Sequence, residues 1–332
     1  MKYKVLGRTG VLVSELCFGT MTFGTEADEP ESTRIFNKCR NAGVNFFDCS
    51  NNYGQGKAEE ILGKLILDCR DEVVITTKVS QRIGKDVNAI GSSRRHIMLS
   101  IEQSLSRLQT DRIDLYIIHH YDPLTAIDET LQALDDLVRQ GKVLYLGVSN
   151  WAAWQIAKAL GVSEKNGSAR FECIEPMYNL VKRQAEVEIF PLAESEQLGV
   201  IAYNPLGAGL LAGKYSKGIK PPSGRIVEKE LYNKRYSNPL YYEIAELFTN
   251  FARKLGVSPV TLAISWVKSS PAVTAPIIGA RNVVQLEDSL AAADFDMSTE
   301  MREKISNLSV SPGTATDRSE EELDLKYQFR NR

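Results

Sequence analysis

The chain alternates between strand-like and helix-like segments along most of its length. Short apolar segments with strand composition lie at 15–19, 44–48, 73–78, 113–119, 143–149, 172–177, 199–204 and 274–279. Helical patterns lie between and after them, at 30–42, 57–67, 94–108, 125–140, 151–161, 184–197, 239–269 and 283–293. Strands that alternate with helices are typical of a mostly parallel sheet. Eight such units predict an α/β fold of the (β/α)8 TIM-barrel class.

Two segments outside this repeat are expected to cover the ends of the barrel. Residues 3–5 and 11–13, separated by Gly7-Arg8-Thr9-Gly10, predict a β-hairpin that caps one end. The stretch 217–238 is rich in Pro, Gly, Lys and Tyr, and it predicts a long loop over the C-terminal face of the barrel.

The chain is expected to continue beyond the barrel. A final helix is predicted at 298–307, and a charged tail follows at 318–332. We find no interdomain linker, and α/β barrels of this size form one core. A single domain spanning 1–332 is therefore expected, with additional helices at its C-terminal end.

The composition argues against nucleic acid and membranes as partners. The 40 basic and 42 acidic residues give a formal net charge of −2, which provides no strong field for either partner. No window reaches the ~18 apolar residues of a membrane span, and no signal-peptide pattern precedes the first strand. Five cysteines without C-x-x-C spacing argue against a disulfide framework and a zinc site. A cytoplasmic protein that acts on a small molecule is expected.

Four ionisable residues, Asp48, Tyr53, Lys78 and His119, lie at or just beyond the C-terminal ends of successive predicted strands. In a parallel barrel these ends open on one face, so the four side chains are expected to meet there. Tyrosine, with an ordinary pKa of about 10, is a proton donor at neutral pH, and a nearby ammonium lowers that pKa by stabilising the phenolate. Lys78 can supply the ammonium, Asp48 its counter-charge, and His119 a hydrogen bond or proton for a substrate oxygen.

This set of groups suits protonation of a carbonyl oxygen at a site without metal. The chain has no serine nucleophile motif, no H-E-x-x-H and no carboxylate cluster with metal-ligand spacing. The residues alone leave simpler interpretations open. Asp48 and Lys78 could equally form a structural ion pair. Tyr53 could equally be an ordinary aromatic residue in a loop. Residues 119 and 120 are both histidines. Because successive strand side chains point to opposite faces, the residues alone do not say which histidine faces the interior of the barrel.

The motifs around these residues resemble those of the aldo-keto reductases. The resemblance extends from Leu6 to the region around Gln285. The matching motifs, in order, are Gly19-Thr20-Met21-Thr22-Phe23-Gly24, Phe47-Asp48, Asn52-Tyr53-Gly54, Thr77-Lys78, Asp114-Leu115-Tyr116 with His119, Gly147-Val148-Ser149-Asn150, and Pro205-Leu206-Gly207 with Gly209-Leu210-Leu211. The resemblance implies that Tyr53 is the general acid and that Lys78, paired with Asp48, lowers its pKa. It selects His119 as the residue that orients the carbonyl.

The resemblance also implies a nicotinamide cofactor, NADPH with NADH as the alternative, that lies extended across the mouth of the barrel. The absence of a convincing G-x-G-x-x-G fingerprint agrees with this binding mode. Arg281 favours NADPH because it can pair with a 2′-phosphate. The residues implied in cofactor binding are Gly19, Thr20, Met21, Asp48, Ser149, Asn150, Glu175, Tyr203, Asn204, Pro205, Leu206, Gly209, Leu210, Lys214, Gly279, Arg281, Gln285, Asp288 and Ser289.

Two functions are therefore considered. The first is reduction of an aldehyde or ketone to an alcohol by hydride transfer from NADPH, with Tyr53 as general acid. The alternative is a module that binds the cofactor and senses its redox state for a partner, as in the potassium-channel β subunits, which the chain also resembles in general plan. The absence of an added N-terminal segment favours the enzyme. Neither the physiological substrate nor the oligomeric state follows from the sequence.

Glu175 departs from the family pattern, which usually has glutamine at this position to hold the nicotinamide carboxamide. A glutamate accepts a hydrogen bond from the amide, but it cannot donate one when ionised, and it adds charge. We predict that Glu175→Gln changes the dissociation constant of NADPH without abolishing the reaction. Titrations of parent and variant from about pH 5 to about pH 9 test this, and equal constants throughout would contradict it.

Overall fold

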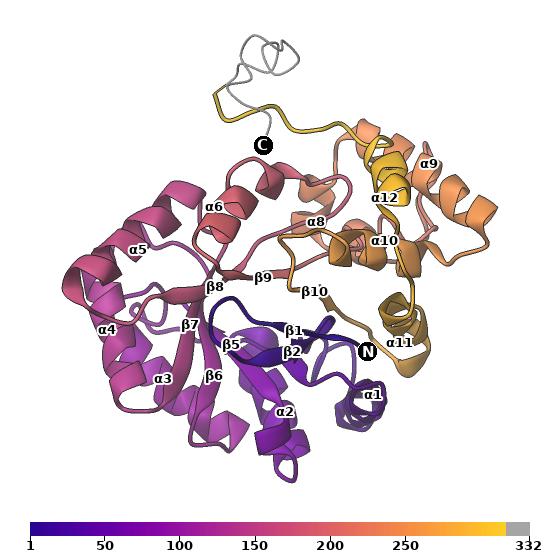
Figure 1. The fold of residues 1–332 in the computed structure, drawn as a ribbon. Helices are drawn as coiled ribbons and strands as arrows, with labels where there is room; N and C mark the ends of the chain where they lie inside the picture. The colour runs from indigo at the N-terminus through magenta and orange to yellow at the C-terminus, as the bar shows by residue number, and fades with distance from the viewer. Residues whose placement is uncertain (317–332) are drawn as a thin grey trace.

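The computed structural model describes residues 1–316 and forms a closed barrel of parallel strands surrounded by helices (Figure 1). Its strands are β3 (Cys17–Gly19), β4 (Phe46–Asp48), β5 (Val74–Val79), β6 (Ile113–Ile118), β7 (Val143–Ser149), β8 (Phe171–Glu175), β9 (Gly199–Ala202) and β10 (Ala275–Ile278). Each strand pairs with its neighbour in sequence, and β10 also pairs with β3 to close the barrel. The predicted barrel class and its eight strands are confirmed.

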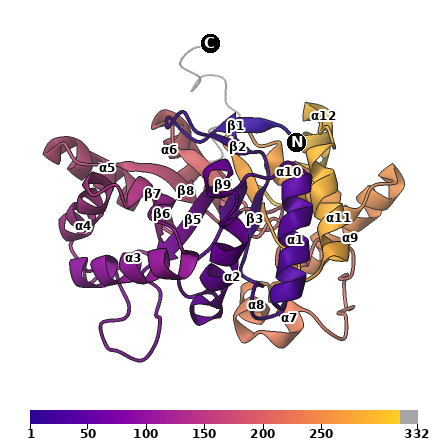
Figure 2. The same ribbon diagram turned by 90° about the horizontal axis from the view of Figure 1, so that it is seen from below.

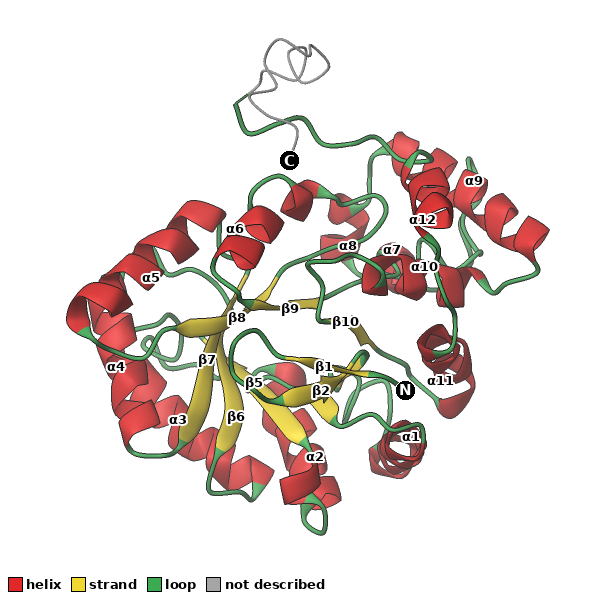
Figure 3. Cartoon of the chain, viewed as in Figure 1, coloured by secondary structure: helices red, strands yellow, loops and turns green. Residues whose placement is uncertain are grey.

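Helices cover the outside of the barrel (Figure 3). Side-chain caps start several of them, since Asp28, Ser93 and Asn282 each accept a hydrogen bond from a backbone N–H of the first turn. The helices between β3 and β9 are α1 (Glu29–Asn41), α2 (Lys57–Ile66), α3 (Arg94–Leu108), α4 (Ile127–Arg139), α5 (Ala153–Asn166) and α6 (Ile189–Ser195). Four more helices, described below, lie between β9 and β10, and α11 (Val283–Leu290) and α12 (Thr299–Ser306) follow β10. Short 3₁₀ turns lie at η1 (Tyr53–Gly56), η2 (Arg70–Glu72), η3 (Gln184–Glu186) and η4 (Ala291–Ala293).

The helical pattern at 239–269 forms two helices, α9 (Pro239–Leu255) and α10 (Pro259–Lys268), and not one. Gly256 ends α9 in the left-handed conformation, with φ of 67°. The side chain of Ser258 then caps α10, whose first residue is a proline. The expectation of one long stretch was wrong because apolar periodicity resumes directly after this break.

The stretch 217–238 is not a loop throughout, because it contains α7 (Arg225–Glu228) and α8 (Glu230–Arg235). Directly after α8, Tyr236 is buried, and its hydroxyl accepts a hydrogen bond from Asn204 Nδ2 at 2.6 Å. In Figure 2, α7 and α8 lie at the opposite end of the barrel from the N-terminal hairpin. The predicted tail at 318–332 lies outside the described residues.

The predicted hairpin is present and closes the N-terminal end of the barrel. It consists of β1 (Tyr3–Val5) and β2 (Leu12–Ser14), paired antiparallel. Between them the backbone at Gly7 comes so close to the barrel that a Cβ there would lie 2.6 Å from the backbone nitrogen of Gly199. Leu6 and Val13 are buried in the interior of the barrel.

The barrel interior is apolar at this end and through its middle. The hairpin packs there against small and large apolar side chains: Cys17, Phe46, Leu115, Ile117, Cys173, Ile201 and Ala275. A larger apolar layer lies between the strands and the outer helices. Polar groups inside the barrel are therefore concentrated at its C-terminal end, where the site described below lies.

Among residues 1–316, no helix is long and apolar enough to cross a membrane.

Two helical glycines provide a matched test of this packing. A Cβ at Gly63 in α2 would lie 2.5 Å from the carbonyl oxygen of Arg107 in α3, whereas a Cβ at Gly161 in α5 meets nothing within 4 Å. Gly63→Ala is expected to lower the free energy of unfolding by about 1–3 kcal/mol, because backbone cannot yield as a flexible side chain does. Gly161→Ala is expected to raise it by about 0.5–1 kcal/mol. Denaturant titration measures both, and a neutral Gly63→Ala would contradict the close helix contact.

Candidate active site

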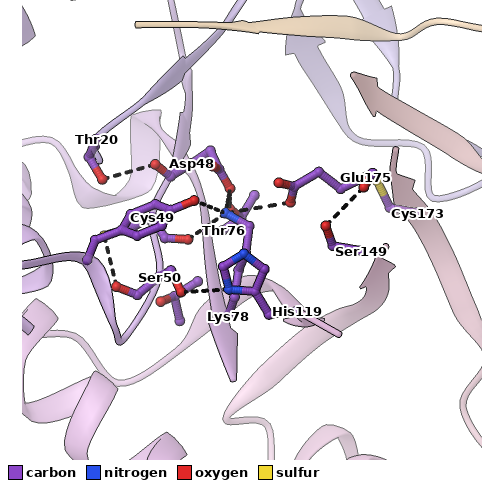
Figure 4. Close-up of polar contacts among 12 residues, drawn as sticks. Thr20, Asp48, Cys49, Ser50, Thr76, Lys78, His119, Ser149, Cys173 and Glu175 are labelled. Atoms are coloured by element: carbon purple, nitrogen blue, oxygen red, sulfur yellow. Dashed lines mark hydrogen bonds and ion pairs between the residues drawn. The ribbon is translucent and has the colours of Figure 1, made fainter. Parts of the chain in front are cut away.

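The structure brings the side chains of Asp48, Tyr53, Lys78 and His119 together at the C-terminal end of the barrel. Asp48 ends β4, Lys78 is the penultimate residue of β5, and His119 directly follows β6. Lys78 Nζ lies 2.5 Å from Asp48 Oδ1 and 3.3 Å from the hydroxyl oxygen of Tyr53. The lysine ammonium is therefore the group that links the carboxylate to the phenol. Figure 4 shows Asp48, Lys78 and His119 side by side at this end of the barrel.

Lys78 is fully buried, with none of its side chain exposed. Its ammonium also donates to the carbonyl oxygen of Cys49 at 2.9 Å. Burial alone would lower the pKa of Lys78, but Asp48 and Glu175 outweigh burial and hold that pKa well above its usual value. Asp48 is fixed in turn, because the hydroxyl of Thr76 donates to Oδ1. The lysine is a permanent cation in this site.

Tyr53 is positioned by an unusual turn. It opens the 3₁₀ turn η1, in which Gly54 and Gln55 both have φ of 57°, and its ring lies edge-on to that of His119 with centroids 6.1 Å apart. Burial raises the pKa of Tyr53; Lys78 lowers it, and Asp48 raises it further. Lys78 thus has the expected lowering effect on the pKa of Tyr53, but the raising effect of burial is larger. Tyr53 therefore keeps its proton at neutral pH.

His119 is buried and lies next to Tyr53. His120 is exposed, and its ring stacks on the ring of His119 with the two centroids 5.3 Å apart. Burial lowers the pKa of His119 well below its usual value, and the charge of Lys78 lowers it further. The ring is therefore neutral, with one nitrogen that donates and one that accepts. Its Nδ1 lies 3.3 Å from the hydroxyl oxygen of Ser50, which leaves Nε2 for another partner.

A chain of polar contacts extends from the histidine to the ends of β7, β8 and β9. Asn150 donates to the carbonyl oxygen of His119 at 3.1 Å and accepts from the Tyr203 hydroxyl at 2.6 Å. Ser149 donates to the backbone oxygen of Glu175 at 2.9 Å. Burial raises the pKa of Tyr203 to about 12, so its ring is neutral. The side chain of Glu175 is almost fully buried, and its Oε2 has no hydrogen-bond partner.

Positive charge gathers at the other side of the mouth. The ammonium group of Lys214 lies beside Gly209, where a Cβ would be 3.9 Å from Nζ. Burial and the nearby charge of Arg281 lower the pKa of Lys214. Glu26 lies within 4.0 Å of Arg281 and 3.4 Å of Arg225. The Lys214–Arg281 pair is suited to phosphate groups, and Glu175 Oε2, which accepts no hydrogen bond, is suited to a ligand donor such as a carboxamide.

Not every residue predicted for cofactor binding presents a side chain to this mouth. Leu210 and Ser289 are buried in the packed core and helix layer. Asp288 accepts a hydrogen bond from the hydroxyl of Ser258 at 2.9 Å. Gln285 does lie near the cationic region, because its Oε1 accepts from the backbone N–H of Arg281 at 3.2 Å.

The remaining predicted residues lie at or after the C-terminal ends of β3, β9 and β10. Thr20 donates through its N–H and hydroxyl to the carbonyl oxygen of Asp48, and it is preceded by Gly19 and followed by Met21. Gly279 follows β10, which pairs with the strand of Gly19. The turn that carries Asn204, Pro205, Leu206 and Gly209 includes three consecutive residues with positive φ, Gly207, Ala208 and Gly209.

Sequence reasoning missed three side chains that position the site: Thr76, Ser50 and Glu26. Thr76 lies opposite Asp48 in the register of β4 and β5 and two residues before Lys78, so strand alternation was a usable signal for it. Ser50 contacts His119 across the barrel end, and Glu26 reaches Arg281 from a distant loop. Neither of these two contacts has a signal in residue spacing. Among the described residues, no group of three or more His, Cys, Asp or Glu side chains is arranged to hold a metal ion.

Comparisons with known proteins agree with this arrangement. The model of the Aldo/keto reductase family matches residues 15–309. The chain is 38% identical over 330 residues to the uncharacterized oxidoreductase YrpG of Bacillus subtilis, covering 95% of this chain and 98% of the relative. It is 36% identical over 302 residues to a probable voltage-gated potassium channel subunit beta of Arabidopsis thaliana, covering 89% and 92%. It is 30% identical over 324 residues to norsolorinic acid reductase B of Dothistroma septosporum, covering 92% and 81%.

Proposed function

Because the chain belongs to the aldo/keto reductase family, we propose that it reduces an aldehyde or ketone to an alcohol with NADPH. The family generally uses nicotinamide cofactors, and relatives named as oxidoreductases support an oxidoreductase. The observation that carries the proposal is the contact of one buried ammonium, Lys78, with both the Asp48 carboxylate and the Tyr53 phenol. That arrangement suits proton donation to an oxygen on which negative charge develops.

The protein's own residues manage the proton and the carbonyl. Tyr53 donates its phenolic proton to the carbonyl oxygen, and the ammonium of Lys78 stabilises the phenolate that remains. Asp48 holds Lys78 in place and offsets the cost of burying its charge. The neutral ring of His119 orients the carbonyl through Nε2, the ring nitrogen that is not in contact with Ser50. The bound cofactor supplies the hydride.

The cofactor would lie across the mouth of the barrel, held by groups that converge there. Ser149, Asn150 and Glu175 would contact the carboxamide, and the neutral ring of Tyr203 would stack on the nicotinamide. Lys214 and Arg281 would bind the pyrophosphate and the 2′-phosphate. We propose NADPH over NADH because two cations meet at the phosphate end. A small carbonyl substrate and a cytoplasmic location complete the proposal.

The alternative function is a module that binds the cofactor and senses its redox state for a partner. It is supported by the similarity to proteins of Arabidopsis thaliana and rice named as probable voltage-gated potassium channel subunit beta. The two functions differ in turnover. Loss of NADPH absorbance with a panel of reactive aldehydes supports the reductase, whereas tight NADPH binding without turnover of any aldehyde would favour the sensor.

The general acid can be tested by removing one oxygen. Tyr53→Phe is expected to lower the rate of carbonyl reduction by about 100-fold or more, because it deletes the proton donor. Its NADPH dissociation constant should stay within about twofold of the parental value, because the cofactor contacts are elsewhere. NADPH oxidation and fluorescence titration measure the two quantities. Near-parental turnover in Tyr53→Phe would show that another group donates the proton.

Cofactor preference can be tested at the phosphate end. Arg281→Ala is expected to raise the dissociation constant of NADPH about tenfold or more, with little change for NADH, because only NADPH has the 2′-phosphate. Arg139→Ala is the control, because Arg139 forms an exposed ion pair with Asp135 in α4. Equal losses of NADPH and NADH affinity in Arg281→Ala would place the arginine elsewhere on the cofactor.

A further inference from the structure

The ammonium of Lys78 has more acceptors around it than hydrogens to give. Asp48 Oδ1 at 2.5 Å and the carbonyl oxygen of Cys49 at 2.9 Å are the nearest. The Tyr53 hydroxyl at 3.3 Å and Glu175 Oε2 at 3.5 Å are farther away. An ammonium has only three N–H groups, and the two nearest acceptors occupy two of them. Tyr53 and Glu175 therefore compete for the third.

Glu175 reaches this ammonium from the far side of the barrel. Figure 4 shows its carboxyl group directed at Lys78 from β8, on a different side from Asp48. Within β8, strand alternation puts Glu175 on the same inward face as Cys173, which belongs to the interior cluster. The side chain of Glu175 is 4% exposed and its Oε2 accepts no hydrogen bond, so its contact with the Lys78 ammonium is shielded from solvent.

The groups that face Glu175 supply one positive charge and one fixed negative charge. Lys78 in β5 is the cation and Asp48 in β4 the competing carboxylate. The neutral groups close enough to interact with its charge are Tyr53, Tyr203, Cys17 and Cys173. Two buried carboxylates against one buried ammonium leave an uncompensated negative charge, which is costly in this setting. A proton on Glu175 removes that charge.

Burial raises the pKa of Glu175 well above its usual value, and Asp48 raises it further, although Lys78 opposes them. With its proton, Glu175 has no need of the third N–H of Lys78, which then stays with Tyr53. Without its proton, Glu175 is the stronger acceptor for that N–H, because a carboxylate binds an ammonium more strongly than a phenol does. Its negative charge also opposes formation of the phenolate.

We propose that Glu175 is a positioning residue that, by holding or releasing a proton, decides whether the third N–H of Lys78 serves Tyr53. This inference rests on the proposed reductase function, in which Tyr53 donates the proton. It gives Glu175 a role toward the lysine in addition to the contact with a cofactor amide. A glutamine at this position would keep the lysine with the tyrosine at every pH.

The rate of the chemical step tests the proposal. The single-turnover rate of NADPH oxidation by an aldehyde is measured for the parent and Glu175→Gln from about pH 5 to about pH 9. The parental rate is expected to fall about tenfold or more as Glu175 ionises, and Glu175→Gln is expected to lack that fall. The same pH dependence in both proteins would overturn the proposal and leave the reductase function standing.

A control variant lies on the same strand. Glu172 is also a partly buried carboxyl group whose pKa burial raises, but it points to the opposite face of β8, toward Arg170. Glu172→Gln is expected to keep the parental pH dependence of the rate. If Glu172→Gln also removed the fall in rate at high pH, the cause would be the negative charge on β8 in general and not the contact between Glu175 and Lys78. That result would overturn the proposal.

A measurement without cofactor separates this inference from the proposed function. A carboxyl group whose pKa is raised on folding contributes stability that is lost as pH rises from the unfolded value, about 4.3, through the folded one. The melting temperature of Glu175→Gln relative to the parent should therefore rise with pH above about 4.3. Glu175→Met is a second uncharged variant, and circular dichroism verifies its fold. A pH-independent difference in both variants would overturn the protonated Glu175 even if no aldehyde were reduced.

Discussion

The ion pair between Lys78 and Asp48 is the constraint on which the site depends. Both side chains are buried at the end of the barrel, with 0% of the Lys78 side chain and 3% of the Asp48 side chain exposed. Leaving either charge without the other inside a protein costs several kcal/mol, so the pair forms only when β4 and β5 are adjacent and in register. That register also puts Thr76 opposite Asp48, where its hydroxyl fixes the carboxylate. The position of the ammonium then determines where a phenol must lie to use it.

The barrel could be predicted from the sequence because each of its strands is a short apolar run between helical patterns. The errors lie where tertiary contacts, or a short break, decide local structure. The helix at 239–269 divides because Gly256 and the cap at Ser258 interrupt it, although apolar periodicity continues on both sides. The short helices within 217–238 are too brief to be stable alone. The buried Tyr236 holds this segment against Asn204, a contact that local sequence does not reveal.

The site was partly predictable for a related reason. Residues at strand ends converge in any parallel barrel, so the proximity of Asp48, Lys78 and His119 followed from the alternation itself. Contacts that cross the barrel or come from loops did not follow. Glu175 was expected beside a cofactor amide, but its carboxyl group also lies 3.5 Å from the ammonium of Lys78. Nothing in the spacing between β5 and β8 indicates that their side chains meet in the interior.

The replacement of an amide by a carboxyl group at position 175 changes what the interior of the barrel can do. An amide has the same charge at every pH, so the lysine and its partner aspartate would stay a neutral pair. A carboxyl group adds a negative charge that burial opposes, and the cluster stays neutral only while Glu175 holds a proton. Proton occupancy at one end of the cluster is thereby coupled to the acidity of Tyr53 at the other through a shared ammonium. Coupling of this kind needs no conformational change, because the contacts involved are already within 3.5 Å of one nitrogen atom.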